Sequence, residues 1–224
     1  MQDYNLNFNQ VNEDIVKCIK CIRLSEYIKD IGKKKVKRYI NSNYWSKPVS
    51  GFGDINAKLM IIGLAPAAHG GNRTGRMFTG DSSGDWLIKA LYKFNLCNQP
   101  YSNDINDGLV LRNVYITSIV KCSPPKNKPL LEEINNCEDY LRKELKLLAK
   151  SSKVFLTLGK LAFDEFCKIH EIKNINFRHG LIYPMKTDKV LISSYHPSKQ
   201  NTNTGKLTWA MWINIFRKII NILI

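Results

Sequence analysis

Cysteines provide the first group in this sequence with a spacing that could do chemistry. The segment "CIKC" places Cys18 and Cys21 at the C-x2-C spacing that lets two thiolates reach one metal centre. Cys97, Cys122, Cys137 and Cys167 complete the set of six. Thiols of a cytosolic protein stay reduced, so we interpret the pair as metal ligands rather than as part of a disulfide framework. A redox pair is the alternative, but the strand–helix context of thioredoxin-like motifs is missing.

A glycine-rich segment is the second such feature. The stretch "GLAPAAHGGNRTGRMFTGDSSGDWL", residues 63–87, holds six of the thirteen glycines. Glycine lets another molecule approach the main chain closely. A mobile surface loop is the alternative, although Met77, Phe78 and Trp86 indicate that parts of the stretch are packed. The order of residues matches neither a P-loop nor a dinucleotide-binding motif, so a nucleotide cofactor is not favoured.

Composition narrows the class of protein and of partner. The 224 residues suffice for one sizeable core, so we expect a single domain over residues 1–224. The 34 Lys and Arg against 19 Asp and Glu give a net charge of +15. This excess favours a polyanionic partner such as nucleic acid, although a membrane surface would give the same bias. The apolar runs are too short to span a bilayer, and the N-terminus shows no targeting pattern, so we expect a cytoplasmic protein.

The elements that must position these residues alternate along the chain. Buried strands are predicted from short apolar runs at residues 58–64, 114–120, 153–159 and 190–196. Amphipathic helices are predicted at residues 85–96, 130–150, 160–169 and 208–223. This alternation predicts an α/β fold, a three-layer α/β/α arrangement with a central, mainly parallel four-stranded sheet.

Three unusual segments start where predicted strands end. They are "GLAPAAHGG" after the first strand, "KCSPPKNKP" at the end of the second and "HPSKQNTNTGKLT" at the end of the fourth. Ligands of open parallel sheets bind beyond the carboxyl ends of the strands. We therefore expect all three segments to face one crevice.

The whole glycine-rich stretch of residues 63–87, together with "KCSPPKNKP" and "HPSKQNTNTGKLT", resembles the uracil-DNA glycosylase superfamily, specifically its iron-sulfur-containing family 5 (type B), over about residues 18–208. The resemblance implies a DNA repair enzyme that hydrolyses the N-glycosidic bond of uracil and of other deaminated bases such as hypoxanthine, leaving an abasic site. It implies that the protein binds DNA that contains uracil or another deaminated base, acts as a monomer and does not contact a membrane. A sliding clamp is a further candidate partner. The alternative is a basic nucleic-acid-binding iron-sulfur or zinc protein without glycosylase activity.

The resemblance assigns a metal site to four of the cysteines. Cys18, Cys21, Cys122 and Cys137 would hold a [4Fe-4S] cluster, although tetrahedral zinc would accept the same four thiolates. Cys137 could instead be a core cysteine, since it lies on the apolar face of a predicted helix. We expect Cys97 and Cys167 to be core or surface thiols.

The resemblance also assigns the base pocket. Phe78 would stack on the extruded base, with an ordinary core phenylalanine as the alternative. The main chain of Gly63, Leu64 and Ala65 would bind carbonyl oxygens of the base. Ser118 would face the base edge where family 4 enzymes have an asparagine, which predicts relaxed discrimination, unless Ser118 lies in the core.

Three further residues would carry the reaction. By resemblance, Asp81 and Asn127 would orient water beside the sugar, and a neutral His196 would donate to the base oxygen. Asp81 could instead cap a helix that begins near Asp85, and Asp85 itself is interpreted as a capping residue. No lysine occupies an obvious nucleophile position, so lyase activity is not expected.

The segment after His196 would contact DNA. Its short polar and basic side chains suit phosphates and the minor groove, with a turn-rich connection to the last helix as the alternative. The expected DNA contacts are Ser198, Gln200, Asn201, Thr202 and Lys206.

Overall fold

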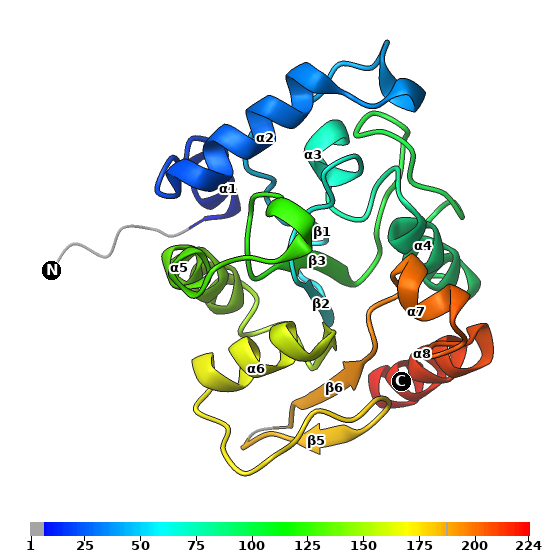
Figure 1. The fold of residues 1–224 in the computed structure, drawn as a ribbon. Helices are drawn as coiled ribbons and strands as arrows, with labels where there is room; N and C mark the ends of the chain where they lie inside the picture. The colour runs from blue at the N-terminus through cyan, green and yellow to red at the C-terminus, as the bar shows by residue number, and fades with distance from the viewer. Residues whose placement is uncertain (1–6, 187) are drawn as a thin grey trace, which may run out of the picture.

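A six-stranded sheet forms the centre of the fold in the computed structural model, which describes residues 7–186 and 188–224 (Figure 1). The strand order is β1-β3-β2-β4-β6-β5, and the four inner strands are parallel, whereas the two edge strands run antiparallel to their neighbours. The strands are β1 (Phe52–Gly53), β2 (Leu59–Gly63), β3 (Val114–Ser118), β4 (Val154–Leu158), β5 (Ile182–Pro184) and β6 (Val190–Ser194).

Helices occupy most of the connections between these strands. The longer ones are α1 (Phe8–Val16), α2 (Ile22–Lys34), α4 (Ser82–Lys93), α5 (Leu131–Leu147), α6 (Lys160–Ile169) and α8 (Trp209–Leu223). The short ones are α3 (Gly71–Thr74), α7 (Lys199–Asn203) and the 3-10 turns η1 (Lys37–Tyr39) and η2 (Pro125–Asn127).

Alternate residues of the inner strands supply two separate cores. In β2, Leu59 and Ile61 pack with α4 and α8 on one face, whereas Met60 and Ile62 pack with α2, α5 and α6 on the other. Figure 1 shows α5 and α6 on one side of the sheet and α4 and α8 on the other. Because both faces are covered, each inner strand reads as a nearly continuous apolar run. The predicted three-layer arrangement is confirmed.

The sheet differs from expectation in its size. The four predicted strands are the four inner ones, but β1 and β5 extend the sheet to six strands. These edge strands span two and three residues, and each has an exposed position, so neither produces an apolar run in the sequence. The extent of the domain, residues 1–224, stays a prediction. Among the described residues, no helix is long and apolar enough to cross a membrane.

One helix begins earlier than predicted. Helix α4 starts at Ser82 with Asp81 as its N-cap, rather than near Asp85. Asp85 lies in the first turn, so its interpretation as a capping residue is wrong. The glycine and serines that the pattern places in a loop enter the helix because the Asp81 carboxylate accepts hydrogen bonds from its first amides.

Candidate active site at the carboxyl ends of the parallel strands

A cavity of about 390 Å³ lies beyond the carboxyl ends of β2, β3 and β6. All three segments that were predicted to face one crevice contribute to its wall. The predicted site residues that line it are Leu64, Ala65, Phe78, Asp81, Ser118, Asn127, His196, Ser198 and Gln200. The topology thus brings together residues that are far apart in the sequence.

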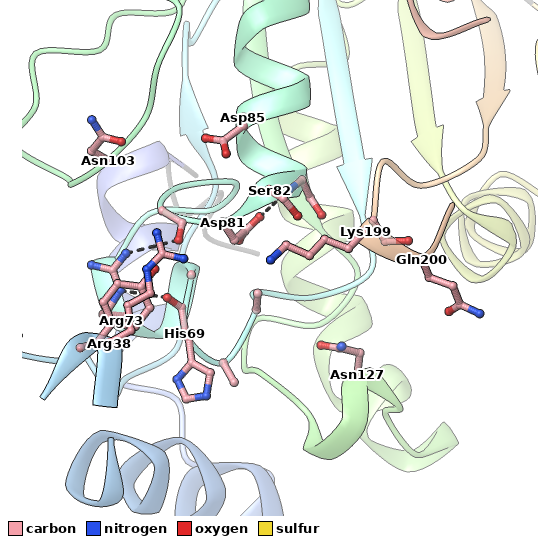
Figure 2. A pocket seen from close by; sticks show the side chains of 17 residues that line it. Arg38, His69, Arg73, Asp81, Ser82, Asp85, Asn103, Asn127, Lys199 and Gln200 are labelled. Atoms are coloured by element: carbon pink, nitrogen blue, oxygen red, sulfur yellow. Dashed lines mark hydrogen bonds between the residues drawn. The ribbon is translucent and has the colours of Figure 1, made fainter. Parts of the chain in front are cut away.

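A larger, more open cavity of about 870 Å³ adjoins the first one (Figure 2). The two share six lining residues, which are Ala67, Asp81, Ser83, Asn127, Ser198 and Gln200. The smaller cavity is therefore an inner chamber and the larger one is its approach from solvent.

Phe78 forms one wall of the inner cavity in a backbone conformation that is unusual for its type. Its φ is 50°, in the left-handed region. Two glycines leave the space that Phe78 needs in this conformation. A Cβ on Gly63 would lie 2.9 Å from the Phe78 ring, and a Cβ on Gly84 would lie 2.2 Å from the Phe78 carbonyl oxygen. Gly63 therefore backs Phe78 rather than lining the cavity itself, and this close packing explains two of the six glycines in the segment.

Main-chain amides reach the same cavity after β2. Ala65 lines it, and its N–H has no hydrogen-bond partner among the described residues. A free amide at a cavity wall can donate to a ligand carbonyl. Leu64 also lines the cavity, but its main chain is partly used by the fold. Its carbonyl oxygen accepts a hydrogen bond from the Val120 amide at 3.0 Å.

Asp81 combines a structural contact with an exposure to both cavities. Its Oδ1 accepts hydrogen bonds from the amides of Ser83 at 2.9 Å and Gly84 at 3.0 Å. Its Oδ2 lies beside Gly70, where an added Cβ would approach to 2.0 Å. Burial raises the pKa of this carboxyl group, while the two amides and the charge of Arg73 partly offset the rise. Asp81 therefore caps helix α4 through Oδ1 and also lines the cavities, where Oδ2 is not used by the helix.

His196 follows β6, lines the inner cavity and packs its ring against that of Phe78. The two rings are stacked with centroids 5.9 Å apart and planes 27° from parallel. Burial lowers the pKa of His196 to about 4, so the imidazole is neutral at pH 7. Asn201 Nδ2 donates to the His196 carbonyl oxygen at 2.8 Å and holds this turn.

Asn127 lies in the η2 turn and, like Asp81, lines both cavities. It is exposed, has a φ of 55°, and makes no side-chain hydrogen bond among the described residues. A bidentate ion pair outside the cavity holds the turn in place. Arg23 donates to both oxygens of Glu133 at 2.7 Å and to the Lys128 carbonyl oxygen at 3.4 Å. This support joins α2 to the η2 turn, and the sequence pattern did not indicate it.

Ser118 lies at the floor of the inner cavity and is only 1 % exposed. Its hydroxyl donates to the Val120 carbonyl oxygen at 2.7 Å. The donor of Ser118 is therefore already used by the protein, and only its oxygen lone pairs can face a ligand.

The predicted DNA-contact residues fall into two groups. Ser198 and Gln200 line both cavities. Asn201, Thr202 and Lys206 line neither. Thr202 donates to the Ser198 carbonyl oxygen at 3.2 Å, and the Lys206 ammonium lies 5.0 Å from the centre of the Tyr195 ring. Asn201 and Thr202 thus hold the loop together in this structure.

The four cysteines predicted as metal ligands line one small cavity away from the candidate active site. Cys18 follows α1, Cys21 caps α2, Cys122 follows β3, and Cys137 lies on α5. Burial, together with the neighbouring thiols, raises the pKa of Cys122, and burial raises the pKa of Cys137 to about 11. Within residues 7–186 and 188–224, no three His, Cys, Asp or Glu side chains are already arranged as a metal site.

The other two cysteines lie elsewhere. Cys97 is buried against α4, where its thiol lies 3.2 Å from the Gln99 carbonyl oxygen, and Cys167 is buried on α6. All six are free thiols. The expectation that Cys97 and Cys167 are core thiols agrees with their burial.

Two buried ion pairs, each with one partner in a segment that forms the site, were not anticipated from the sequence. Lys121 and Glu144 are 1 % and 0 % exposed and lie 2.7 Å apart, with Thr117 bonded to both. Arg76 and Asp107 also lie 2.7 Å apart and tie the glycine-rich segment to the loop before β3. Loss of one partner would leave an uncompensated buried charge, so we expect each pair to hold together the two segments that it joins.

Comparison with known proteins decides the family. The family model described as the uracil DNA glycosylase superfamily matches residues 50–220. The chain belongs to the uracil DNA glycosylase superfamily. It is 46% identical over 204 residues to a type-5 uracil-DNA glycosylase of Pyrobaculum aerophilum, covering 91% of this chain and 88% of the relative.

Two further relatives place the chain within the superfamily. It is 40% identical over 206 residues to the type-5 enzyme of Thermus thermophilus, covering 91% of this chain and 92% of the relative. It is 39% identical over 211 residues to that of Mycobacterium leprae, covering 93% and 92%. The family 5 assignment made from the three motif segments is confirmed.

Proposed function

We propose that this member of the superfamily is a hydrolase that cleaves the N-glycosidic bond of uracil in DNA and leaves an abasic site. One observation carries the proposal. A carboxylate (Asp81), a carboxamide (Asn127) and a neutral imidazole (His196) line a single cavity of about 390 Å³ at the carboxyl ends of the strands. Because the bond is hidden in the duplex, the nucleotide must be extruded into such a cavity.

Asp81 supports the sugar in this mechanism. Cleavage leaves positive charge on the sugar and negative charge on the departing base. The free Oδ2 of Asp81 stabilises the first charge and, with the Asn127 amide, orients the attacking water. The position of Asp81 between the two cavities supports this role, because the sugar of an extruded nucleotide lies between its base and the backbone.

His196 and Ala65 act on the base. A neutral imidazole can donate a hydrogen bond to the base oxygen on which negative charge develops, and the low pKa of His196 keeps the ring neutral. The unpartnered Ala65 amide offers a second donor. Phe78 supplies an aromatic wall against which the base stacks.

We also propose that hypoxanthine is a substrate beside uracil. The Ser118 hydroxyl already donates to Val120, so it does not read the base edge as an asparagine amide would. Single-turnover excision of uracil and hypoxanthine from otherwise identical duplexes tests this, with Ser118→Asn as the variant that should shift preference toward uracil. Strict uracil specificity of the wild type would rule it out.

For the cysteine cavity, we propose a [4Fe-4S] cluster held by Cys18, Cys21, Cys122 and Cys137. The gathering of four thiols from four separate segments around one small cavity supports it. The cluster would supply a structural cross-link rather than a step of the reaction. Zinc is compatible with the same ligands and is distinguished by metal analysis.

The alternative function is a nucleic-acid-binding protein without glycosylase activity. Incubation with a uracil-containing oligonucleotide, followed by alkali, separates the two. We expect a cut strand only after alkali, because the enzyme is proposed to lack lyase activity. An Asp81→Asn, His196→Gln double variant, purified identically, controls for a contaminating glycosylase. Binding of the wild type without any alkali-labile site would favour the alternative.

The remaining proposals concern the setting of the enzyme. We propose that it acts on DNA as a cytoplasmic monomer, with a sliding clamp as the protein partner to test. Size-exclusion chromatography coupled to light scattering tests the monomer, and addition of the purified clamp tests the partner.

A further inference from the structure

Three positively charged side chains line the outer cavity of about 870 Å³ that adjoins the inner one, together with two aspartates (Figure 2). Arg38, Arg73 and Lys199 line it and come from the η1 turn, helix α3 and helix α7. None of the three forms an ion pair among the described residues, whereas Arg23 and Arg76 each bond a carboxylate. In the described part of the chain, no carboxylate is within ion-pair distance of these three groups, although Asp81 and Asp85 line the same cavity.

Arg73 has a fixed orientation within this wall. Its Nε donates to the His69 carbonyl oxygen at 2.9 Å, and its Nη2 donates to the Gly80 carbonyl oxygen at 3.4 Å. Its guanidinium lies 4.1 Å from the centre of the Tyr39 ring, close enough for a cation–π contact. A guanidinium has five N–H donors, so some donors of Arg73 have no acceptor among the residues that the structure describes.

The main chain at Gly80 and His69 leaves room for the Arg73 guanidinium and accepts its hydrogen bonds. Gly80 has a φ of 71°, and a Cβ there would lie 2.1 Å from Arg73 Nη2. His69, whose carbonyl oxygen accepts from Arg73, is itself held by the Tyr44 hydroxyl at 2.9 Å from its Nδ1. Arg73 also lowers the pKa of Asp81 by its charge, so the two groups influence each other across the cavity.

We propose that Arg73, oriented by Tyr39, binds a phosphodiester group of the DNA strand that carries the extruded nucleotide, with Arg38 and Lys199 adding charge at the rim. A guanidinium matches phosphate oxygens in a bidentate geometry and holds them more strongly than a neutral donor does. The inference rests on the proposed function. If the base occupies the inner cavity and its sugar lies beside Asp81, the adjoining phosphate enters the outer cavity.

A binding measurement on DNA that cannot be cleaved tests the proposal. The probe is a duplex with a tetrahydrofuran abasic analogue, with either native phosphates or one neutral methylphosphonate at each flanking position in turn. We expect Arg73→Gln to weaken binding to native DNA roughly tenfold, from the loss of a charge-assisted hydrogen bond. On one methylphosphonate duplex, the wild type and Arg73→Gln should bind equally.

Matched controls separate this contact from a general loss of charge. Arg112 is exposed and lies two residues before β3, at the opposite end of the sheet, so Arg112→Gln should bind native DNA like the wild type. Tyr39→Phe keeps the ring and should also bind normally, whereas Tyr39→Ala should weaken binding by less than Arg73→Gln does. Equal losses by Arg73→Gln on every duplex, or no loss on native DNA, would overturn the proposal.

Failure here is distinguishable from failure of the proposed function. The binding experiment needs no excision, so the phosphate contact can be established even in a protein that leaves uracil in place. Conversely, the wild type could excise uracil while Arg73→Gln shows no loss that depends on one phosphate. The proposed function would then stand, and the phosphate contact of Arg73 would be refuted.

Discussion

At the scale of single residues, Asp81 carries two separable roles. Its Oδ1 caps α4, while its charge is proposed to act on the sugar. Asparagine is as good an N-cap as aspartate but is neutral. Asp81→Asn should therefore keep the unfolding temperature within about 2 °C, since its cap is retained, and lower single-turnover excision of uracil by about 100-fold.

The alanine variant completes this test. Asp81→Ala removes both cap and charge, so it should lose about 1 kcal/mol of stability in addition to its activity. Stability is measured by thermal unfolding and activity by single-turnover kinetics. If Asp81→Asn excises uracil at the wild-type rate, Asp81 serves only as a cap.

His196 gives a prediction on pH. Its pKa is lowered by burial to about 4, below the ordinary value near 6.5, so the neutral form persists as pH falls through 6.5. The ¹³Cε1 chemical shift of His196, assigned with His196→Gln, should stay constant between pH 8 and about 5. The rate of uracil excision should show no midpoint near 6.5, and a titration of both signals at that pH would contradict the neutral-donor role.

At the scale of elements, Gly84 tests how α4 positions Phe78. Alanine is favoured over glycine inside a helix by about 1 kcal/mol. At this position, however, its Cβ would lie 2.2 Å from the Phe78 carbonyl oxygen, a backbone atom. We expect Gly84→Ala to destabilise the fold by about 1–3 kcal/mol through overpacking and to slow uracil excision.

A second glycine provides the control. Gly108 has a φ of 80°, and within the described residues an added Cβ would meet Gln99 Oε1 alone, at 3.9 Å. Gly108→Ala should lose about 1 kcal/mol from backbone strain and excise uracil at the wild-type rate. If Gly84→Ala and Gly108→Ala change the excision rate equally, the effect of Gly84→Ala does not come from displacement of Phe78.

The cysteine cavity joins α1, α2, the segment after β3, and α5. If the proposed cluster is bound, replacing Cys122 by serine should release it and lower the unfolding temperature by roughly 10 °C, because a metal that binds only the folded chain stabilises it. Cys97→Ala and Cys167→Ala should keep the metal. The wild type should be brown, with broad absorbance near about 400 nm. A colourless protein with stoichiometric zinc would contradict the cluster.

Elements with a strong local pattern were predictable from the sequence, and elements that depend on distant partners were not. The inner strands were predictable because burial on both faces leaves continuous apolar runs. Strand β1 was not, because its two residues are defined only by their pairing with β3. Asp81, Asn127 and His196 became candidates through the ordered motifs of the resemblance, and in the structure all three line one cavity.

The contacts that support these residues had no comparable signal. Lys121 and Glu144 are 23 residues apart, and Arg23 and Glu133 are 110 apart, with nothing local to indicate that either pair is bonded. Arg73 was visible in the glycine-rich segment, but its contact with Tyr39 depends on how η1 lies against α3. A sequence pattern identifies the type of side chain, whereas its partner depends on the tertiary fold.

At the scale of the whole molecule, the net charge of +15 predicts a strong dependence of DNA binding on salt. Each phosphate contact releases counterions, so several contacts lower affinity by roughly 1,000-fold between 50 and 200 mM salt. A lysine should contribute to this salt dependence only if it lies where DNA binds. Lys126 and Lys128 border the inner cavity and are exposed to solvent, where DNA phosphates can reach them. Lys58 and Lys153 are also exposed but lie just before β2 and β4, at the opposite end of the sheet.

Two double variants with the same change in net charge separate position from amount. Lys126→Gln with Lys128→Gln should reduce the slope of log affinity against log salt by about 1 to 2, because phosphate contacts are lost. Lys58→Gln with Lys153→Gln should leave the slope unchanged, since those lysines face away from the cavities. Fluorescence anisotropy with a labelled abasic duplex gives both slopes. Equal reductions in the two variants would mean that the excess charge attracts DNA to the whole surface, rather than binding it at the cavity end of the sheet.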